Sequence, residues 1–306
     1  MTSETKTNIA QDFFTDYKQI QDNDRRPLAN IYWKSPDVDN VHACLYLFHG
    51  YGGSPVEPCL KLPMQYALDK GMTVVAIEGV DLSATSGTEK NVSEMTLQRQ
   101  KQALDAGIHF CKQSPQFSQK YNIAWAHSIS CRALSDLILE KPDLRHYFNE
   151  IVLNNPYFLP PPKVYALRDK VMRKDPTGQT WALMMHRLVT RVRTIENRRF
   201  SVPTCLYNLA VPLPNAWRTR QQDLQKLARI VSRFITDMRM CFVLGTGDDN
   251  ADYNQNMQLF QGLAVPAKQA LSIPGANHSF ENAQAQYLDT SRLILDGIIG
   301  RTRHTM

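Results

Sequence analysis

The sequence predicts an α/β fold built on a mainly parallel sheet with helices on both faces. Short apolar runs recur along the chain, segments with helical periodicity alternate with them, and glycine or proline marks many of the transitions. Strands that are apolar at every position are buried on both faces, which is typical of parallel sheets covered by helices. With 306 residues and a 43% hydrophobic composition, the chain can bury a core of this kind.

The N-terminal part of the chain begins the alternation. Residues 31–33 (IYW) indicate a first strand or one half of a hairpin. The apolar run 43–48 (ACLYLF) predicts a buried strand that stops at the glycine-rich segment HGYGG. A helix is expected over 57–70, where Gly71 ends it, and residues 72–78 (MTVVAIE) predict a second fully apolar strand.

The next segments repeat the pattern. After a polar loop, a helix is expected over 95–112, and residues 122–127 (NIAWAH) predict another strand. This strand turns abruptly at Ser128 into a segment, 130–140, whose leucines and isoleucine supply the apolar face of a helix. Residues 150–156 (EIVLNNP) predict the strand that follows.

Residues 160–238 interrupt the alternation. They begin with three prolines and then show two apolar stripes at helical spacing with almost no strand signal, which predicts a helical insertion. Alternation resumes with a strand at 240–245 (MCFVLG), a helix over 256–263, a strand at 268–273 (KQALSI) and a final helix over 281–299. The predicted organisation is an α/β core formed by 1–159 and 239–306, with 160–238 inserted.

The net charge of +6 is unevenly distributed. Of the 35 Lys+Arg and 29 Asp+Glu residues in the chain, 16 and 5 respectively lie between Pro160 and Arg239, a local balance of +11. Such a basic face can draw in an anionic substrate, a phospholipid surface or a CoA-type leaving group, and a solvated helix face is the alternative reading. Because no nucleic-acid motif accompanies the charge, nucleic acid is not an expected partner. The basic face includes Arg187, Arg191, Arg193, Arg198, Arg199, Arg218, Arg220, Lys226, Arg229 and Arg233.

The cysteines and the chain start indicate the compartment. The six cysteines show neither CxxC spacing nor nearby histidines, so the sequence predicts no zinc site and no disulfide framework. The first residues (MTSETKTNIAQDFF) lack the basic start and apolar run of a secretory signal, and no stretch approaches the ~20 apolar residues that span a bilayer. A soluble, cytoplasmic protein is therefore expected. The cysteines are Cys44, Cys59, Cys111, Cys131, Cys205 and Cys241.

Polar residues suited to catalysis follow several predicted strands, at the end where parallel sheets bind ligands. They are the His49-Gly50-Tyr51 turn, Ser128, Asp248 and His278. A serine hydroxyl is a weak nucleophile, so it needs a histidine to take its proton, a carboxylate to orient that histidine, and N–H donors for the oxyanion. This set offers a candidate for each role, which predicts hydrolysis of an ester or thioester with Ser128 as the nucleophile.

At this point the chain resembles the α/β-hydrolase superfamily, whose nucleophile lies in the turn G-x-S-x-G and whose triad follows the order Ser, acid, His. The corresponding turn here is Ala126-His127-Ser128-Ile129-Ser130, so Ala126 and Ser130 stand where the family has glycines. Both are small enough for the turn to close. His127 is similar to the histidine of the GHSxG form in the lipase and esterase branch, and packing is its more ordinary role.

The resemblance also implies the acid and the base. The segment Gly245-Thr246-Gly247-Asp248 is similar to the family's G-x-x-D loop and implies Asp248 as the acid, with Asp249 and Asp252 as competitors. A solvated acidic loop is the alternative reading. The segment 273–280 (IPGANHSF) is similar to the family's histidine loop and implies His278 as the base.

For the oxyanion hole, the resemblance implies the backbone N–H groups of Tyr51 and Ile129. The alternative for HGYGG is a simple glycine turn, and a phosphate loop is disfavoured because the Lys-Ser/Thr ending is missing. The insertion 160–238 lies where this family often places a lid. It therefore looks like a cap, whose apolar stripes either line an acyl pocket or pack the cap onto the core.

The activity that the resemblance implies is that of a capped serine hydrolase that forms an acyl-enzyme at Ser128, with no metal and no organic cofactor. The expected substrate is a small-molecule or lipid acyl ester, with an anionic group as one option. An acyl thioesterase or acyltransferase would use the same triad. A non-catalytic scaffold that binds a membrane or a protein partner through the basic cap is the alternative from another class.

Overall fold

The computed structural model describes residues 13–37, 41–50, 53–79, 97–118, 120–158, 238–265 and 267–302, together with residues 166, 170, 173, 174 and 225. Apart from these single positions and residue 238, the predicted helical insertion at 160–238 lies outside the described residues. Its basic face and its proposed role as a cap therefore stay predictions.

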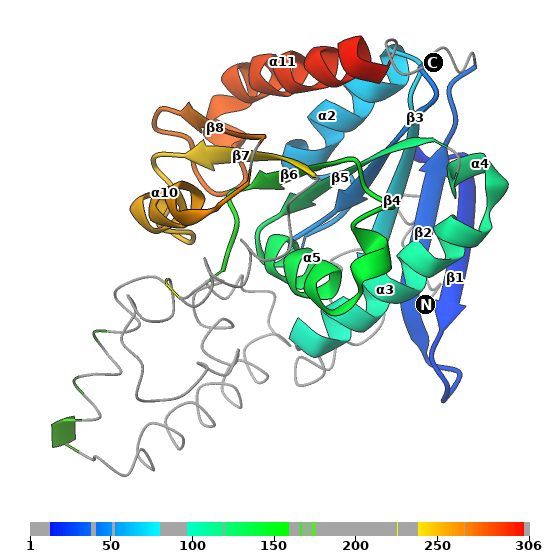
Figure 1. Ribbon diagram of the computed structural model, residues 1–306, viewed down its shortest axis with the longest axis horizontal. Helices are drawn as coiled ribbons and strands as arrows, with labels where there is room; N and C mark the ends of the chain where they lie inside the picture. The colour runs from blue at the N-terminus through cyan, green and yellow to red at the C-terminus, as the bar shows by residue number, and fades with distance from the viewer. Residues whose placement is uncertain are drawn as a thin grey trace, which may run out of the picture.

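In the described part of the chain, eight strands form one sheet in the order β1-β2-β4-β3-β5-β6-β7-β8 (Figure 1). The pairs β1-β2 and β2-β4 are antiparallel, and every later pair is parallel. The predicted mainly parallel sheet is confirmed. The strands are β1 (Asp16–Gln21), β2 (Pro27–Lys34), β3 (Ala43–Phe48), β4 (Thr73–Gly79), β5 (Tyr121–His127), β6 (Glu150–Asn154), β7 (Arg239–Gly245) and β8 (Lys268–Ile273).

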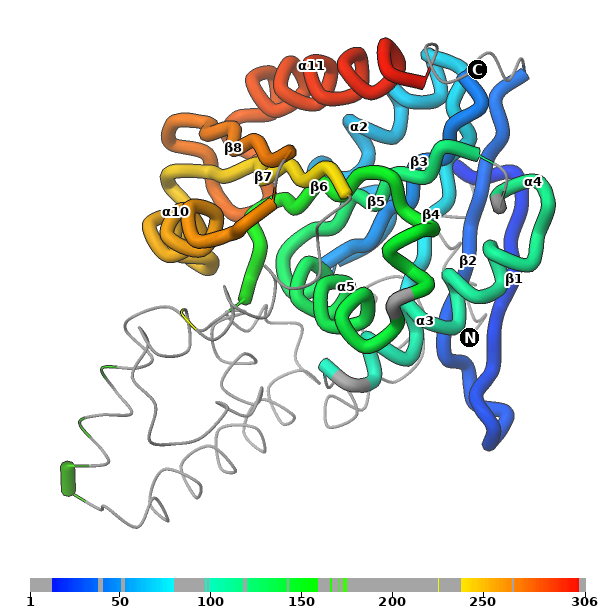
Figure 2. The backbone as a smooth tube through the Cα atoms, viewed as in Figure 1, coloured from blue at the N-terminus to red at the C-terminus, as the bar shows by residue number. Residues whose placement is uncertain are grey.

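Helices cover both faces of this sheet, as the apolar strands predicted (Figure 1). On one face, α2 (Pro58–Asp69) and α11 (Gln284–Thr302) lie side by side although they are far apart in the sequence (Figure 2). The other face is covered by α3 (Leu97–Gln113), α5 (Ile129–Glu140) and α10 (Tyr253–Gly262). Shorter turns are α4 (Pro115–Ser118), η3 (Pro142–Leu144) and η4 (Glu281–Ala283).

Each face of the sheet has its own apolar core. Alternate side chains of the all-buried strand β3 point in opposite directions, so Tyr46 packs with the cluster under α3 and α5 while Leu45 packs with the cluster under α2 and α11. Trp125 of β5, fully buried, belongs to the second cluster. The sheet is thereby fixed between two helical layers, which holds the ends of its strands in place.

The first strand is the main element that the sequence did not predict. The IYW segment lies in β2, which forms a hairpin with β1, and β1 has the polar sequence DYKQIQ. Because β1 is an edge strand that is mostly exposed, it carries no apolar run to reveal it. The hairpin is thus the second of the two alternatives that the sequence left open.

Two helix boundaries differ from those expected. α10 begins at Tyr253, three residues before the expected start, because the Asp252 carboxylate accepts a hydrogen bond from the Gln255 N–H at 2.7 Å and caps the helix. The expected final helix is divided into the turn η4 and α11, which continues to Thr302. Among the described helices, none has the length and apolar character required to cross a bilayer.

Candidate active site

Ser128 lies at a sharp turn between the end of β5 and the start of α5. Its backbone has φ 56° and ψ −123°, a conformation that residues other than glycine rarely adopt. Holding a residue in such a conformation costs of order 1–3 kcal/mol of folding free energy. The turn is held by its own backbone: the Ser128 N–H donates to the Asn154 carbonyl at 3.1 Å, and the Ser128 carbonyl accepts from the Tyr157 N–H at 3.1 Å. The strained serine is therefore held firmly at the carboxyl end of the central strand.

The residues around Ser128 leave just enough room for this turn. A Cβ atom added to Gly50 would lie 2.9 Å from the Ser128 Cβ, so the HGYGG loop can pass only because this residue is glycine. Ser130, which stands where the family has a glycine, is fully buried. Its hydroxyl donates to the His49 carbonyl and accepts from the Gln100 amide at 2.8 Å, so the extra atoms are accommodated by hydrogen bonds.

The three predicted triad side chains are brought together. The Nε2 atom of His278 lies 2.8 Å from the Ser128 hydroxyl, and its Nδ1 atom lies 2.7 Å from Oδ2 of Asp248. An ionised carboxylate only accepts hydrogen bonds, so Nδ1 carries the proton and Nε2 is free to accept from Ser128. The side chain of Asp248 is 1% exposed and that of His278 is 12% exposed, so the imidazole keeps some access to solvent while the carboxylate is covered.

Asp248, and neither of its two competitors, faces the base. Its second oxygen, Oδ1, accepts from the backbone N–H groups of Asn250 and Ala251 at 2.7 and 2.9 Å. Asp249 is exposed, and Asp252 caps α10. Both oxygens of the Asp248 carboxylate are therefore fixed, which is the arrangement expected of a group that orients a histidine.

The acid and base loops are packed directly against each other. A Cβ added to Gly245 would lie 2.4 Å from the Ala276 carbonyl oxygen, and the Gly247 N–H donates to that same oxygen at 3.1 Å. Glycine at the end of β7 thus allows the GTGD segment to touch the IPGANHSF segment. The contact fixes the distance from Asp248 to His278.

Asn155 is a site residue that the sequence analysis missed. Its side-chain amide donates to the carbonyls of Asn277 and His278 at 3.1 and 2.8 Å, and its side-chain oxygen accepts from the Gly245 N–H at 2.7 Å. The residue is 1% exposed and has a positive φ of 39°. Its place directly after β6, in the motif NNP, is the sequence signal that it carries, and asparagine tolerates the positive φ better than most residues.

The two predicted oxyanion donors have different outcomes. Ile129 is the first residue of α5, so its N–H has no acceptor within the helix and lies at the positive end of the helix dipole, directly beside Ser128. This position is compatible with the predicted donor role, which stays a prediction. Tyr51 lies outside the described residues, and its role stays a prediction.

A buried acid and histidine lie behind the triad. His127, which is 2% exposed, directs Nε2 to the His278 carbonyl at 3.0 Å and Nδ1 toward the Glu57 carboxylate at 3.5 Å, and the two imidazole rings are 4.9 Å apart. Burial disfavours charge on both groups, but each supplies the counter-charge of the other. The pKa of the Glu57 carboxyl is consequently lowered and the pKa of His127 is raised.

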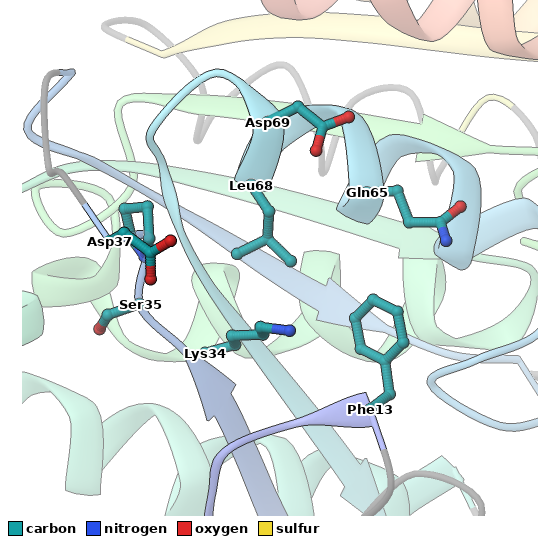
Figure 3. A pocket seen from close by; sticks show the side chains of 8 residues that line it. Phe13, Lys34, Ser35, Asp37, Gln65, Leu68 and Asp69 are labelled. Carbon is teal, nitrogen blue, oxygen red and sulfur yellow. The ribbon is translucent and has the colours of Figure 1, made fainter.

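Two surface hollows lie away from this site. One, of about 460 Å³, is lined by residues that include Phe13, Lys34 and Asp69 (Figure 3). The first turn of α2 lies near the triad, and the last turn of α2 lines this hollow. The hollow is therefore separated from the triad by the length of that helix. The second, of about 450 Å³, opens beside the first residues of β6, β7 and β8. Since neither contains a triad residue, neither is the candidate active site.

Comparison with solved structures identifies the fold. The structure of Est1E from Butyrivibrio proteoclasticus is 12% identical, with a TM-score of 0.58 over 93% of this chain and 99% of the other. A monoacylglycerol lipase from Paleococcus ferrophilus is 15% identical, with a TM-score of 0.56 over 88% and 98%. An alpha-beta serine hydrolase homologue from Coxiella burnetii is 8% identical, with a TM-score of 0.53 over 91% and 96%.

No protein-family model matches the sequence, and no curated protein sequence matches it either. At identities this low, the likeness to solved structures shows the fold alone. The chain has the α/β-hydrolase fold, as the resemblance of its motifs implied.

Proposed function

We propose that this chain with the α/β-hydrolase fold is a serine hydrolase that cleaves carboxylic esters through an acyl-enzyme at Ser128. The observation that carries the proposal is the hydrogen-bond chain from Asp248 through His278 to Ser128, with distances of 2.7 and 2.8 Å. All three residues follow the carboxyl ends of parallel strands, and the serine occupies a strained turn that exposes its hydroxyl to the base.

Acylation follows from this geometry. The Ser128 oxygen attacks the ester carbonyl while Nε2 of His278 takes the hydroxyl proton, and Asp248 stabilises the imidazolium that forms. The negative charge that develops on the carbonyl oxygen is stabilised by the Ile129 N–H at the start of α5. As the tetrahedral intermediate collapses, the bond to the alcohol breaks and Nε2 gives its proton to the leaving oxygen.

Deacylation uses the same groups with water in place of the serine. Nε2 of His278 takes a proton from water, and the resulting hydroxide attacks the acyl carbonyl. When the bond to Ser128 breaks, Nε2 returns the proton to the serine oxygen and the carboxylic acid leaves. One ester and one water molecule thus give one acid and one alcohol, and the triad returns to its starting protonation.

An apolar cluster beside the nucleophile favours a hydrophobic acyl group. Ile129, Tyr157 and Ala251 pack together next to Ser128, with Leu97 against them. Two of the similar structures are Est1E, which has also been solved with ferulic acid bound, and a monoacylglycerol lipase. We therefore propose acyl esters, with an aromatic or an aliphatic acid, as the substrate class. Thioesters and acyl transfer to another acceptor use the same mechanism and form the second option.

The predicted basic cap adds a proposal about the leaving group. Because 160–238 carries 15 Lys+Arg and 5 Asp+Glu residues, a balance of +10, we propose that it attracts esters or thioesters with an anionic headgroup, or an anionic membrane surface that presents them. The scaffold alternative requires a triad that does not act. A separated serine and histidine would have favoured it, and the 2.8 Å between Ser128 and His278 gives it no such support.

The test is labelling by a fluorophosphonate probe, with turnover of p-nitrophenyl acetate and butyrate recorded in parallel. We expect the wild type to be labelled and to hydrolyse the esters, and Ser128→Ala to do neither. Methyl ferulate and an acyl-CoA in the same panel separate ester from thioester substrates.

Ser135→Ala is the matched control, because Ser135 is also a buried serine on α5 and, among the described residues, its hydroxyl bonds only to the Cys131 carbonyl in the same helix. This variant is expected to be labelled like the wild type. An unlabelled wild type would favour the scaffold, and labelling that survives in Ser128→Ala would mean that another serine is the nucleophile.

A further inference from the structure

Three potential metal ligands gather behind the active site. Glu57 is the residue that precedes α2, Cys59 lies in its first turn, and His127 is the last residue of β5. One ligand atom from each lies within 4.8 Å of the others, and Cys59 and His127 are 0% and 2% exposed. The sequence predicted no metal site because the histidine is 70 residues from Glu57 and 68 residues from Cys59.

The contact between His127 and Glu57 requires a positive charge between them. The Nε2 atom of His127 lies 3.0 Å from the His278 carbonyl, which only accepts, so this nitrogen carries a proton. In the neutral ring, Nδ1 is then a lone pair that faces a carboxylate oxygen of Glu57 at 3.5 Å. Two acceptors that face each other repel. Either a second proton on the ring or a metal ion must hold them together.

The distance between the two atoms is longer than the ion pair of a protonated His127 with Glu57 should give, and it matches two ligands of one metal ion. A charge-assisted hydrogen bond between nitrogen and a carboxylate oxygen is about 2.7–2.9 Å long. Both Nδ1 of His127 and Oε1 of Glu57 are buried, and neither has a hydrogen-bond partner in the described part of the chain. In a tetrahedral zinc site with bonds of about 2.0–2.2 Å, nitrogen and oxygen ligands lie about 3.4 Å apart, which matches the observed 3.5 Å.

The third group and the surroundings fit zinc as well. A thiolate, an imidazole and a carboxylate are all common zinc ligands, and a thiol loses its proton on binding. The ion's two positive charges would balance the Cys59 thiolate and the Glu57 carboxylate, which leaves the buried site neutral. Zinc-binding histidines usually donate their other N–H to a carbonyl or carboxylate, as His127 does toward His278.

We propose that Glu57, Cys59 and His127 form a zinc site, with one coordination position left for a fourth ligand. The site joins the start of α2 to the end of β5, and His127 extends the connection to the backbone of His278. Neither Ser128 nor the imidazole of His278 is a ligand of the proposed ion, and no step of the proposed hydrolysis uses it, so its role is structural. It holds the loop that carries the base, and the proposal stands independently of the hydrolase activity.

The test is a titration of the full, chelator-treated chain with Co²⁺, which reports tetrahedral and thiolate coordination by its absorption bands. We expect one equivalent of Co²⁺ to produce a thiolate-to-cobalt charge-transfer band and visible bands of tetrahedral intensity, and one equivalent of Zn²⁺ to abolish both. The same stoichiometry is expected when Zn²⁺ is measured by competition with a chromophoric chelator. Zinc is also expected to raise the melting temperature of the chain, because it binds only the folded site.

Variants locate the site. Cys59→Ala is expected to lose the charge-transfer band and the zinc-dependent shift in melting temperature. Cys111→Ala, which removes another fully buried thiol on α3, is expected to keep both. A wild-type titration without a charge-transfer band would overturn the proposal on its own, even if a variant failed to fold. Bands that persist in Cys59→Ala would overturn it too, since the ion would then bind elsewhere.

Discussion

Replacing Asp248 by asparagine should reverse the tautomer of the catalytic histidine without disturbing the fold. Oδ1 of Asp248 accepts two backbone N–H groups, from Asn250 and Ala251, at 2.7 and 2.9 Å. The new amide keeps its oxygen at that position, because turning its NH₂ group toward two donors would sacrifice both bonds, at about 1–3 kcal/mol for each buried group. The NH₂ group then faces Nδ1 of His278.

An NH₂ donor in that position favours the imidazole tautomer that carries its proton on Nε2. This nitrogen lies 2.8 Å from the Ser128 hydroxyl and can then no longer accept its proton. Loss of the correct tautomer in a serine triad lowers kcat by about 10⁴-fold, which corresponds to about 5.4 kcal/mol of transition-state stabilisation. We expect a loss of this size in Asp248→Asn.

The assay is kcat for p-nitrophenyl acetate, measured beside the free energy of unfolding in urea. Asp249→Asn is the matched control, because Asp249 is the adjacent acid and is exposed to solvent. It should keep wild-type kcat, and both variants should unfold within about 1 kcal/mol of the wild type. If Asp248→Asn retained kcat within tenfold of the wild type, or if Asp249→Asn lost it instead, the assignment of the acid would be refuted.

Three further variants test the surroundings of the triad. Gly50→Ala places a Cβ 2.9 Å from that of Ser128, so kcat/KM should fall by about 10²-fold; a wild-type value would show that the loop does not restrict the nucleophile. Asn155→Ala removes the two hydrogen bonds from the side-chain amide to the carbonyls of Asn277 and His278. We expect kcat to fall at least about tenfold with little change in KM. A rise in KM of the same size would indicate a role in substrate binding instead. Tyr287→Phe removes a buried hydroxyl that donates to the Cys59 carbonyl and accepts from the Trp125 indole and the Asn154 amide. Urea denaturation should show a free energy of unfolding lowered by about 1–3 kcal/mol, while kcat is retained. An unchanged free energy of unfolding would contradict the contribution of this network.

The strands that consist of one continuous apolar run were predictable from the sequence. The strands β3, β4 and β5 are buried at nearly every position, and their runs mark them without any neighbouring information. Since parallel strands of one sheet end at the same edge, the residues after those strands could also be expected to meet there. Together with the resemblance of their loops to family motifs, this position pointed to Ser128, Asp248 and His278, with Asp249 and Asp252 as competitors for the acid.

What could not be predicted depends on contacts between distant segments. The edge strand β1 is polar because only one neighbour covers it, so it has no apolar signal. Asn155 acts through three hydrogen bonds to two other loops, and a single sequence does not show where those loops pass. The same holds for Glu57, Cys59 and His127, whose proximity arises only when the start of α2 comes to lie at the end of β5.

The proposed acyl-enzyme can be observed directly. The protein is mixed with p-nitrophenyl butyrate, quenched in acid during turnover, digested and analysed by mass spectrometry. We expect the peptide containing Ser128 to gain the mass of one butyryl group, and the gain to disappear in Ser128→Ala. Butyryl mass on a different residue, or p-nitrophenol release without any acylated peptide, would contradict a mechanism in which Ser128 is the nucleophile.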